Sequence, residues 1–128
     1  MQDKQLTLVP LEITLSICRL APQERIPEWV NAAGDFLSIT RTRAELSVVC
    51  PAGLVPGGIR AEAGWKAFKV QGQLDFGLTG ILAAIAEPLA KKSISIFAVS
   101  TYDTDYVLVK EADFAAARHI LKNDFVIG

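Results

Sequence analysis

The chain is poor in the residues that bind metals and form disulfides. Among its 128 residues it has only two cysteines, Cys18 and Cys50, which lie far apart, and one histidine, His119. Because no Cys-x-x-Cys pair is present, a zinc site of the usual cysteine and histidine kind is not expected. Each cysteine ends an apolar stretch that reads as a strand, which predicts two reduced and packed thiols.

Long apolar runs and clusters of positive charge are also missing. The longest apolar-rich stretch, residues 78–90, contains Gly80, Glu87 and Pro88, and it falls short of the ~18 residues that a membrane span needs. The first five residues are polar and no secretory signal follows them, so we expect a cytoplasmic protein. The net charge is −1 and no basic run exceeds Lys91-Lys92, so neither nucleic acid nor membrane is expected as a partner.

Sequence signatures of catalysis are absent as well. No phosphate-binding loop or dinucleotide fingerprint occurs, and no nucleophile has a base partner that the sequence makes evident. His119 is expected on the polar side of its helix. Asp103 and Asp105 form a carboxylate pair, but nothing else supplies the rest of a hydrolase or metal site. We therefore expect a protein that is not an enzyme and has no catalytic residues, metal or cofactor; acid/base chemistry at the two aspartates is the least favoured alternative.

What the chain does have is apolar periodicity. Hydrophobic residues make up 51% of it, enough for a well-filled core. Leu11, Ile13, Leu15 and Ile17 alternate with polar residues, which predicts a strand with these four side chains on one face. The remaining patterns predict strands over residues 36–40, 45–50, 65–70, 95–99, 105–109 and 125–127, and helices from Pro27, over 78–92 and over 111–123.

The order of these elements predicts the fold class. The second half reads strand, helix, strand, strand, helix, strand, which is a ferredoxin-like α+β unit with an antiparallel sheet covered on one face by two helices. The first half imitates this order at an offset of 60 residues, because residues 36–40 align with 96–100 and 45–49 with 105–109. Its second helix is reduced to the Pro/Gly-rich stretch after Pro51. We therefore predict a tandem repeat with a degenerate N-terminal copy, residues 1–62, and a C-terminal copy, residues 63–128.

A glycine-containing segment leads into the long helix of the second half. The first N–H groups of a helix have no intrahelical partner, so together with the helix dipole they can bind a carboxylate. The alternative is purely structural: a side chain of the segment caps the helix, and Gly80 allows close packing of helix and sheet. The candidate binding residues in this segment are Asp75, Gly77, Thr79, Gly80 and Ile81.

A second polar segment lies between two apolar strands. Every residue from Ser100 to Tyr106 carries a hydroxyl or a carboxylate group. Turn formation explains Ser100 and Thr104 well, but it explains less well two acids and two tyrosines in one tight connection. A carboxylate here can hold an ammonium group, and Tyr102 can cover an aliphatic or cationic side chain. Together the two segments have the polarity of a free α-amino acid.

Residues 94–109 resemble the ACT-domain regulatory proteins related to the CASTOR arginine sensors and to the regulatory ACT repeats of aspartate kinase. Residues 75–82 resemble the ligand loop of that family, and residues 38–50 are similar to it more weakly. The resemblance implies tandem ACT modules that bind amino acids at interfaces between repeats. The loop and helix start would hold the carboxylate side, and the hairpin turn would contact the amino group or the side chain. The family's binding positions fall here on Asp75, Gly77, Gly80, Ile81, Thr101, Tyr102 and Asp105.

The resemblance therefore implies an amino-acid-binding regulatory module. We expect it to form a homodimer and to act in trans on another protein, such as a regulated enzyme, because no catalytic domain is attached. The alternative is an ACT-fold interaction module that kept the fold and lost its ligand. An RNA-binding sheet is set aside, since the central strands offer few aromatic residues and no basic cluster.

Overall fold

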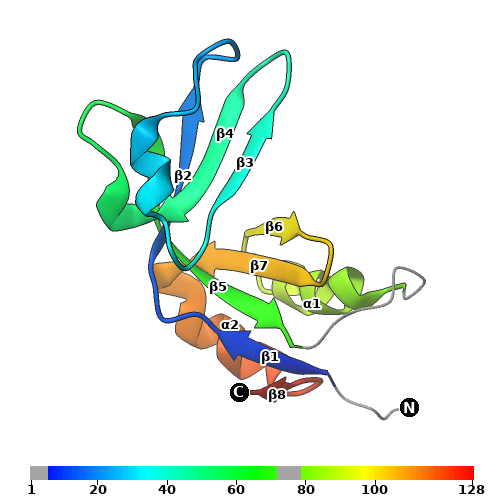
Figure 1. The fold of residues 1–128 in the computed structure, drawn as a ribbon. Helices are drawn as coiled ribbons and strands as arrows, with labels where there is room; N and C mark the ends of the chain where they lie inside the picture. The colour runs from blue at the N-terminus through cyan, green and yellow to red at the C-terminus, as the bar shows by residue number, and fades with distance from the viewer. Residues whose placement is uncertain (1–5, 72–78) are drawn as a thin grey trace. The chain divides into compact units, whose positions relative to one another are not determined.

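The computed structural model describes residues 6–71 and 79–128. The chain divides into two compact units, which we call the N-terminal unit (residues 13–65) and the C-terminal unit (residues 1–12 and 66–128). One long strand, β5 (Arg60–Val70), contributes its first part to the N-terminal unit and its last part to the C-terminal unit (Figure 1).

The C-terminal unit contains five strands and two α-helices within its described residues. Helices α1 and α2 pack against each other on one face of its sheet (Figure 1). The strand order is β6-β7-β5-β1-β8. Besides β5, the elements are β1 (Thr7–Pro10), α1 (Ile81–Lys91), β6 (Ile96–Ser100), β7 (Asp105–Lys110), a 3-10 turn (Glu111–Asp113), α2 (Phe114–Leu121) and β8 (Val126–Ile127).

This arrangement confirms the predicted α+β class and corrects the predicted sheet. From β5 onward the order is strand, helix, strand, strand, helix, strand, as the periodicity indicated. The sheet is mixed rather than wholly antiparallel, because β1 inserts between β5 and β8 and runs parallel to β8. The prediction missed this pair since β1 lies far from β8 in sequence and its apolar run, ended by Pro10, carries no sign of its partner.

The core of the C-terminal unit lies between this sheet and the two helices. The inward helix positions recur at steps of three and four, so Ile85 and Leu89 of α1 are fully buried, with Ile81 and Leu82 partly buried beside them. Phe68 of β5 is also fully buried, and its ring stacks on a phenylalanine at the start of α2. The other buried members are Leu8, Val70, Ile94, Val107, Val109, Ala117, Leu121 and Phe125.

The N-terminal unit has a four-stranded sheet with the order β3-β4-β2-β5, in which each neighbouring pair is antiparallel. Its helical elements are single 3-10 turns, as the short and Pro/Gly-rich segments predicted. The buried cluster contains Cys18, Leu20, Val30, Leu46, Val48 and Cys50. The elements are β2 (Leu15–Leu20), η1 (Glu28–Ala32), β3 (Ser38–Arg41), β4 (Leu46–Pro51) and η2 (Ala52–Leu54).

The start predicted for the first alternating strand is wrong. Strand β2 begins at Leu15, not at residue 11. Of the predicted set, Leu15 is fully buried and Ile17 is partly buried, while Cys18 and Leu20 belong to the buried cluster of the unit. The register between β2 and β5 shifts by one residue between Leu15 and Ile17, and a pattern within one strand cannot anticipate such a shift.

The two cysteines are buried free thiols on neighbouring strands, as predicted. Cys18 lies in β2 and Cys50 in β4, each at most 1% exposed. Burial raises the pKa of Cys50 to about 11, and the nearby Cys18 thiol adds to the rise. Burial raises the pKa of Cys18 as well. Both groups therefore stay protonated in the folded protein over the ordinary pH range.

We expect replacement of Phe68 by alanine to lower the free energy of unfolding by about 3–5 kcal/mol, because the buried ring leaves a cavity. Urea denaturation followed by circular dichroism measures this change. Ile26→Ala is the control, since the Ile26 side chain is 50% exposed and its truncation should cost no more than about 0.5 kcal/mol. Equal effects of the two substitutions would contradict the assigned core.

We also expect the thiols to make stability depend on pH. In the unfolded chain Cys50 ionises near its ordinary pKa of 9.0, whereas in the folded protein it holds its proton until about 11. Its contribution is full below pH 9 and is lost as pH rises toward 11, by at most about 1.4 kcal/mol per pH unit.

Urea titrations between pH 7 and 11 test this dependence. The difference in unfolding free energy between the natural chain and the Cys50→Ala variant should shrink across the window from pH 9 to 11. A difference that stays constant from pH 7 to 11 would show that the thiol does not hold its proton on folding.

Candidate functional site

The polar segment from Ser100 to Tyr106 forms the turn between β6 and β7. Ser100 pairs with Asp105 in the ladder, which leaves residues 101–104 as the loop. The N–H of Thr101 donates to the carbonyl of Thr104 at 2.8 Å. The Thr101 hydroxyl donates to the same carbonyl at 3.0 Å and accepts from the Thr104 N–H at 3.3 Å. Thr101 therefore shapes the turn, and a direct ligand contact by its hydroxyl would compete with these bonds.

Thr104 fixes the turn against another strand. Its side chain is 3% exposed, and its hydroxyl donates to the carbonyl of Val70, the last residue of β5, at 2.5 Å. The chain passes from the end of β5 through residues 72–78 to the start of α1. The hydrogen bond thus ties the polar turn to the strand end from which the glycine-containing segment departs.

Sequence reasoning missed this role of Thr104. The segment gave Thr104 a local turn role, whereas its acceptor lies 34 positions away along the chain. The only visible signal was a threonine among acids in a polar turn, and that pattern does not identify a distant carbonyl. Buried hydroxyl groups need such partners, because an unpaired one costs free energy.

The other two predicted residues of the turn differ in exposure. Tyr102, at the tip of the loop, is 75% exposed, which is unusual for so large a side chain. Asp105, the first residue of β7, is half-buried. The turn therefore presents an exposed phenol and a half-buried carboxylate at the start of β7, and a carboxylate is the acceptor that an ammonium-bearing ligand needs.

Among the described residues, no side chain caps the start of α1. Gly80 is the N-cap with φ of 80°, a left-handed conformation that suits glycine, and exposed Thr79 supplies no capping bond to it. A Cβ at Gly80 would meet no atom within 4 Å, so the glycine serves the backbone turn and not close packing. Ile81 is partly buried against the core. Asp75 and Gly77 lie outside the described residues.

The described part of the chain contains neither a metal-binding cluster nor a helix able to span a membrane. No group of three or more histidine, cysteine, aspartate or glutamate side chains within residues 6–71 and 79–128 is placed to hold a metal ion. No helix in these ranges combines the length and the apolar character that crossing a membrane requires.

We expect replacement of Thr104 by valine to lower the free energy of unfolding by about 1–3 kcal/mol, because the Val70 carbonyl loses its buried donor. Chemical denaturation measures the loss. Thr40→Val is the matched control, since Thr40 lies exposed in β3. Equal stability of the Thr104 variant and the natural chain would show that the bond does not hold the turn.

Comparison with protein families accounts for both units of the chain. The profile of the ACT domain matches residues 60–123, half of the chain. A second profile, described as an N-terminal domain, matches residues 14–58.

Individual proteins with similar sequences include a sensor and a protein of known structure. The human cytosolic arginine sensor for mTORC1 subunit 1 is 35% identical over 72 residues, which cover 52% of this chain and 22% of that protein. The chain spans less than half the length of the curated relatives it matches. A crystal structure of an Agobacterium tumefaciens protein is 38% identical with a TM-score of 0.91, covering 98% of this chain and 94% of that one.

Other solved structures share the fold of this chain at low sequence identity. The regulatory subunit of aspartate kinase from Thermus thermophilus, in its ligand-free form, has a TM-score of 0.65 at 11% identity, covering 95% of this chain and 99% of that one. These relatives are described as regulatory domains and a sensor, not as catalytic domains. With half of its length matched by the profile, the chain belongs to the ACT domain family.

Proposed function

We propose that the chain is an amino-acid-binding regulatory module that acts in trans on another protein. The observation that carries this proposal is the hydrogen bond from Thr104 to Val70, which brings the polar turn to the strand end that leads into α1. A ligand at this end of the sheet could then contact both the carboxylate of Asp105 and the N-terminus of α1. The family of the chain and the sensor among its relatives support the same function.

The roles of the site residues follow from their chemistry. Within the described residues no side chain caps the first N–H groups of α1, after Gly80, so these groups can bind the ligand carboxylate. Thr79 would contact the carboxylate beside them, and Asp75 and Gly77, which lie outside the described residues, are proposed as further contacts. Asp105 would hold the ammonium group. The ring of Tyr102, which is largely exposed, would cover the side chain of the ligand. Ile81 would form the apolar floor.

We further propose that the N-terminal half is a degenerate repeat, residues 1–62, followed by the full repeat, residues 63–128. Support comes from the strand order within each unit. In the N-terminal unit the strands β2, β3, β4 and β5, taken as first to fourth, lie in the order second, third, first, fourth. In the C-terminal unit β5, which belongs to both sheets, β6, β7 and β8 lie in the same order, with β1 inserted between the first and the fourth strand. Single 3-10 turns stand in the N-terminal unit where the other copy has helices.

A homodimer would complete the site. Within the described residues β6 pairs with β7 alone, so its other edge is available to a second copy across a two-fold axis. Ile96, Phe97 and Val99 on this strand are only partly buried in the single chain. The protein would then be a cytoplasmic dimer, in line with the cytosolic sensor among its relatives, with neither nucleic acid nor membrane as partner.

The second candidate function is an ACT-fold interaction module without a ligand. The hydroxyl of Thr101 favours it, because this predicted ligand contact is already engaged inside the turn. Such a module would keep the fold and the dimer. It would not be stabilised by any amino acid, and this difference separates the two functions.

The deciding experiment is thermal unfolding of the purified protein with each of the twenty amino acids in millimolar excess. A ligand at about a hundred times its dissociation constant adds roughly 2.7 kcal/mol of stability, which raises the melting temperature by several degrees. We expect one or a few amino acids to give this shift. We expect the Asp105→Asn variant to lose it, because the acceptor for the ammonium group becomes neutral.

The matched control is Asp35→Asn, which removes the same charge from an exposed position of the N-terminal unit. This variant should keep the full shift. If no amino acid stabilises the natural chain, the ligand-free interaction module replaces the sensor. If the Asp105 variant responds as the natural chain does, the ammonium contact lies outside the turn.

A further inference from the structure

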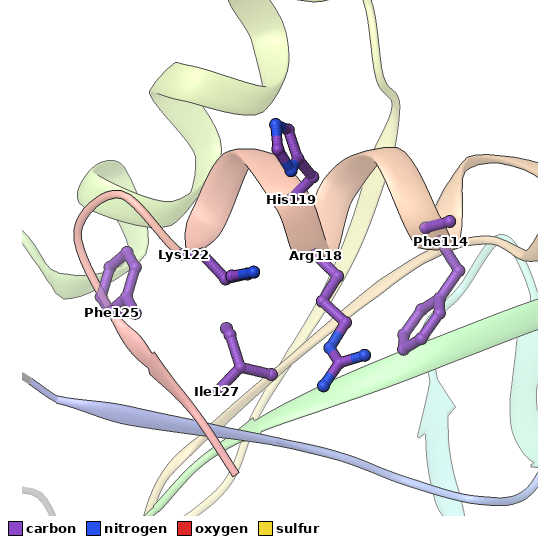
Figure 2. Close-up of a pocket in the computed structure, with 7 residues that line it drawn as sticks. Phe114, Arg118, His119, Lys122, Phe125 and Ile127 are labelled. Carbon is purple, nitrogen blue, oxygen red and sulfur yellow. The ribbon is translucent and has the colours of Figure 1, made fainter.

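A hollow of about 510 Å³ lies in the C-terminal unit beside α2. In Figure 2 the side chains of Arg118, Lys122 and Ile127 extend toward the same space between the helix and the last strand, while His119 projects from the helix in another direction. The volume is within the range of about 300–1,000 Å³ that small-molecule sites occupy. The lining residues are Phe114, Ala115, Arg118, His119, Lys122, Phe125 and Ile127.

The polar part of this lining carries one sign of charge. Arg118 and Lys122 are cations, His119 is a third basic side chain, and within the described residues no aspartate or glutamate lines the hollow. Asp124 follows in sequence, but it is exposed and is not part of the wall. The whole chain has slightly more acidic than basic residues, 14 against 13, so a lining of three basic side chains without an acid is a local departure.

The rest of the lining is apolar and held in place. The ring of Phe114 stacks on Phe68 with centroids 4.8 Å apart, and the ammonium of Lys66 lies 5.9 Å from the centroid of the Phe114 ring. Phe125 is only 6% exposed, so its ring position is fixed by the core. The hollow therefore has a packed aromatic wall next to exposed cationic groups.

A simpler explanation covers only part of this arrangement. Basic residues near the C-terminus of a helix interact favourably with its dipole, and Arg118 and His119 lie in the last turn of α2. Lys91 and Lys92 have the same position at the end of α1. The helix dipole accounts for the basic residues. It does not account for a hollow that these residues line together with two packed aromatic rings and Ile127.

We propose that this hollow binds a small organic anion, a carboxylate or phosphate joined to an aromatic or branched aliphatic group. The guanidinium of Arg118 and the ammonium of Lys122 bind the acid group, and a guanidinium can pair with either acid in a two-pronged manner. Phe114, Phe125 and Ile127 contact the apolar body. The site lies at the β8 edge of the sheet, and the β6–β7 turn belongs to the opposite edge, so it is separate from the proposed amino-acid site.

Phenyl phosphate is the first probe, because it combines a phosphate with an aromatic ring. Titration of the full chain, followed by backbone amide chemical shifts in two-dimensional NMR, should give saturable changes confined to residues 114–127 and the strands beside them. Phenylacetate tests the carboxylate in the same way. Inorganic phosphate should bind at least tenfold more weakly than phenyl phosphate, because it lacks the apolar body.

The matched variants are two double substitutions with equal changes of charge. Arg118→Gln with Lys122→Gln should weaken the binding of phenyl phosphate at least tenfold. Lys91→Gln with Lys92→Gln, at the end of α1, should change it less than twofold. All four side chains are exposed, and the NMR spectrum of each variant reports whether its fold is intact.

The proposal fails if neither aromatic acid gives saturable shifts, if the shifts spread over the whole surface, or if the two double variants lose affinity equally. Equal binding of phenyl phosphate and inorganic phosphate would also overturn it, since the aromatic wall would then contribute nothing. The amino-acid screen bears on the other edge of the sheet, so its result leaves this test unchanged.

Discussion

The fold of both units depends on the pairing of a single strand. Residues at the start of β5 pair with β2, and those at its end pair with β1. The register within the N-terminal unit fits one extra residue on β5 between Glu62 and Trp65, and Gly64 there has φ of 82°. A left-handed glycine in an extra position is the usual way to keep a ladder intact across a bulge. The strand therefore continues for 11 residues although its register against β2 shifts by one residue.

The same strand also determines where the candidate site forms. Its last carbonyl, on Val70, accepts a hydrogen bond from the hydroxyl of Thr104, and this bond is buried, whereas the bonds of the Thr101 hydroxyl inside the turn are only partly buried. Tyr102 lies two residues before Thr104 in the loop, and Asp105 follows Thr104 as the first residue of β7, so the bond helps to position both. The residues of chemical interest thus lie on a turn that a buried threonine holds in place.

The sequence predicted best what local periodicity determines. The α1 positions Ile81, Leu82, Ile85 and Leu89 are buried or partly buried as expected, because a helix repeats its face whatever its neighbours do. Strands β5, β6, β7 and β8 of the C-terminal unit were anticipated for the same reason, whereas β1 was missed. The family was identified from the likeness of residues 94–109. The start of α1 is three residues later than expected, since Gly80 adopts a conformation outside the helix.

What the sequence did not predict depends on partners that are distant along the chain. The register shift between β2 and β5 depends on the pairing of two distant strands, and the acceptor of Thr104 lies in another strand. His119 was expected on the polar side of its helix, and Arg118 and Lys122 were not singled out. Only the packing of Phe125 and Ile127 beside them turns that face into the wall of a hollow. Predictions from one segment cannot contain such information.

The pairing of β1 with β8 has a consequence for the order in which the protein can fold during synthesis. The N–H groups of Val126 and Gly128 donate to the carbonyls of Leu6 and Leu8. The pairing of β1 is therefore complete only after β8 has been synthesised. Closing so long a loop is entropically costly and slow. The N-terminal unit, by contrast, is one continuous segment and can assemble while the ribosome is still translating the rest. Until translation reaches residue 126, β1 has one edge unpaired, and a nascent chain in that state is open to association with other strands.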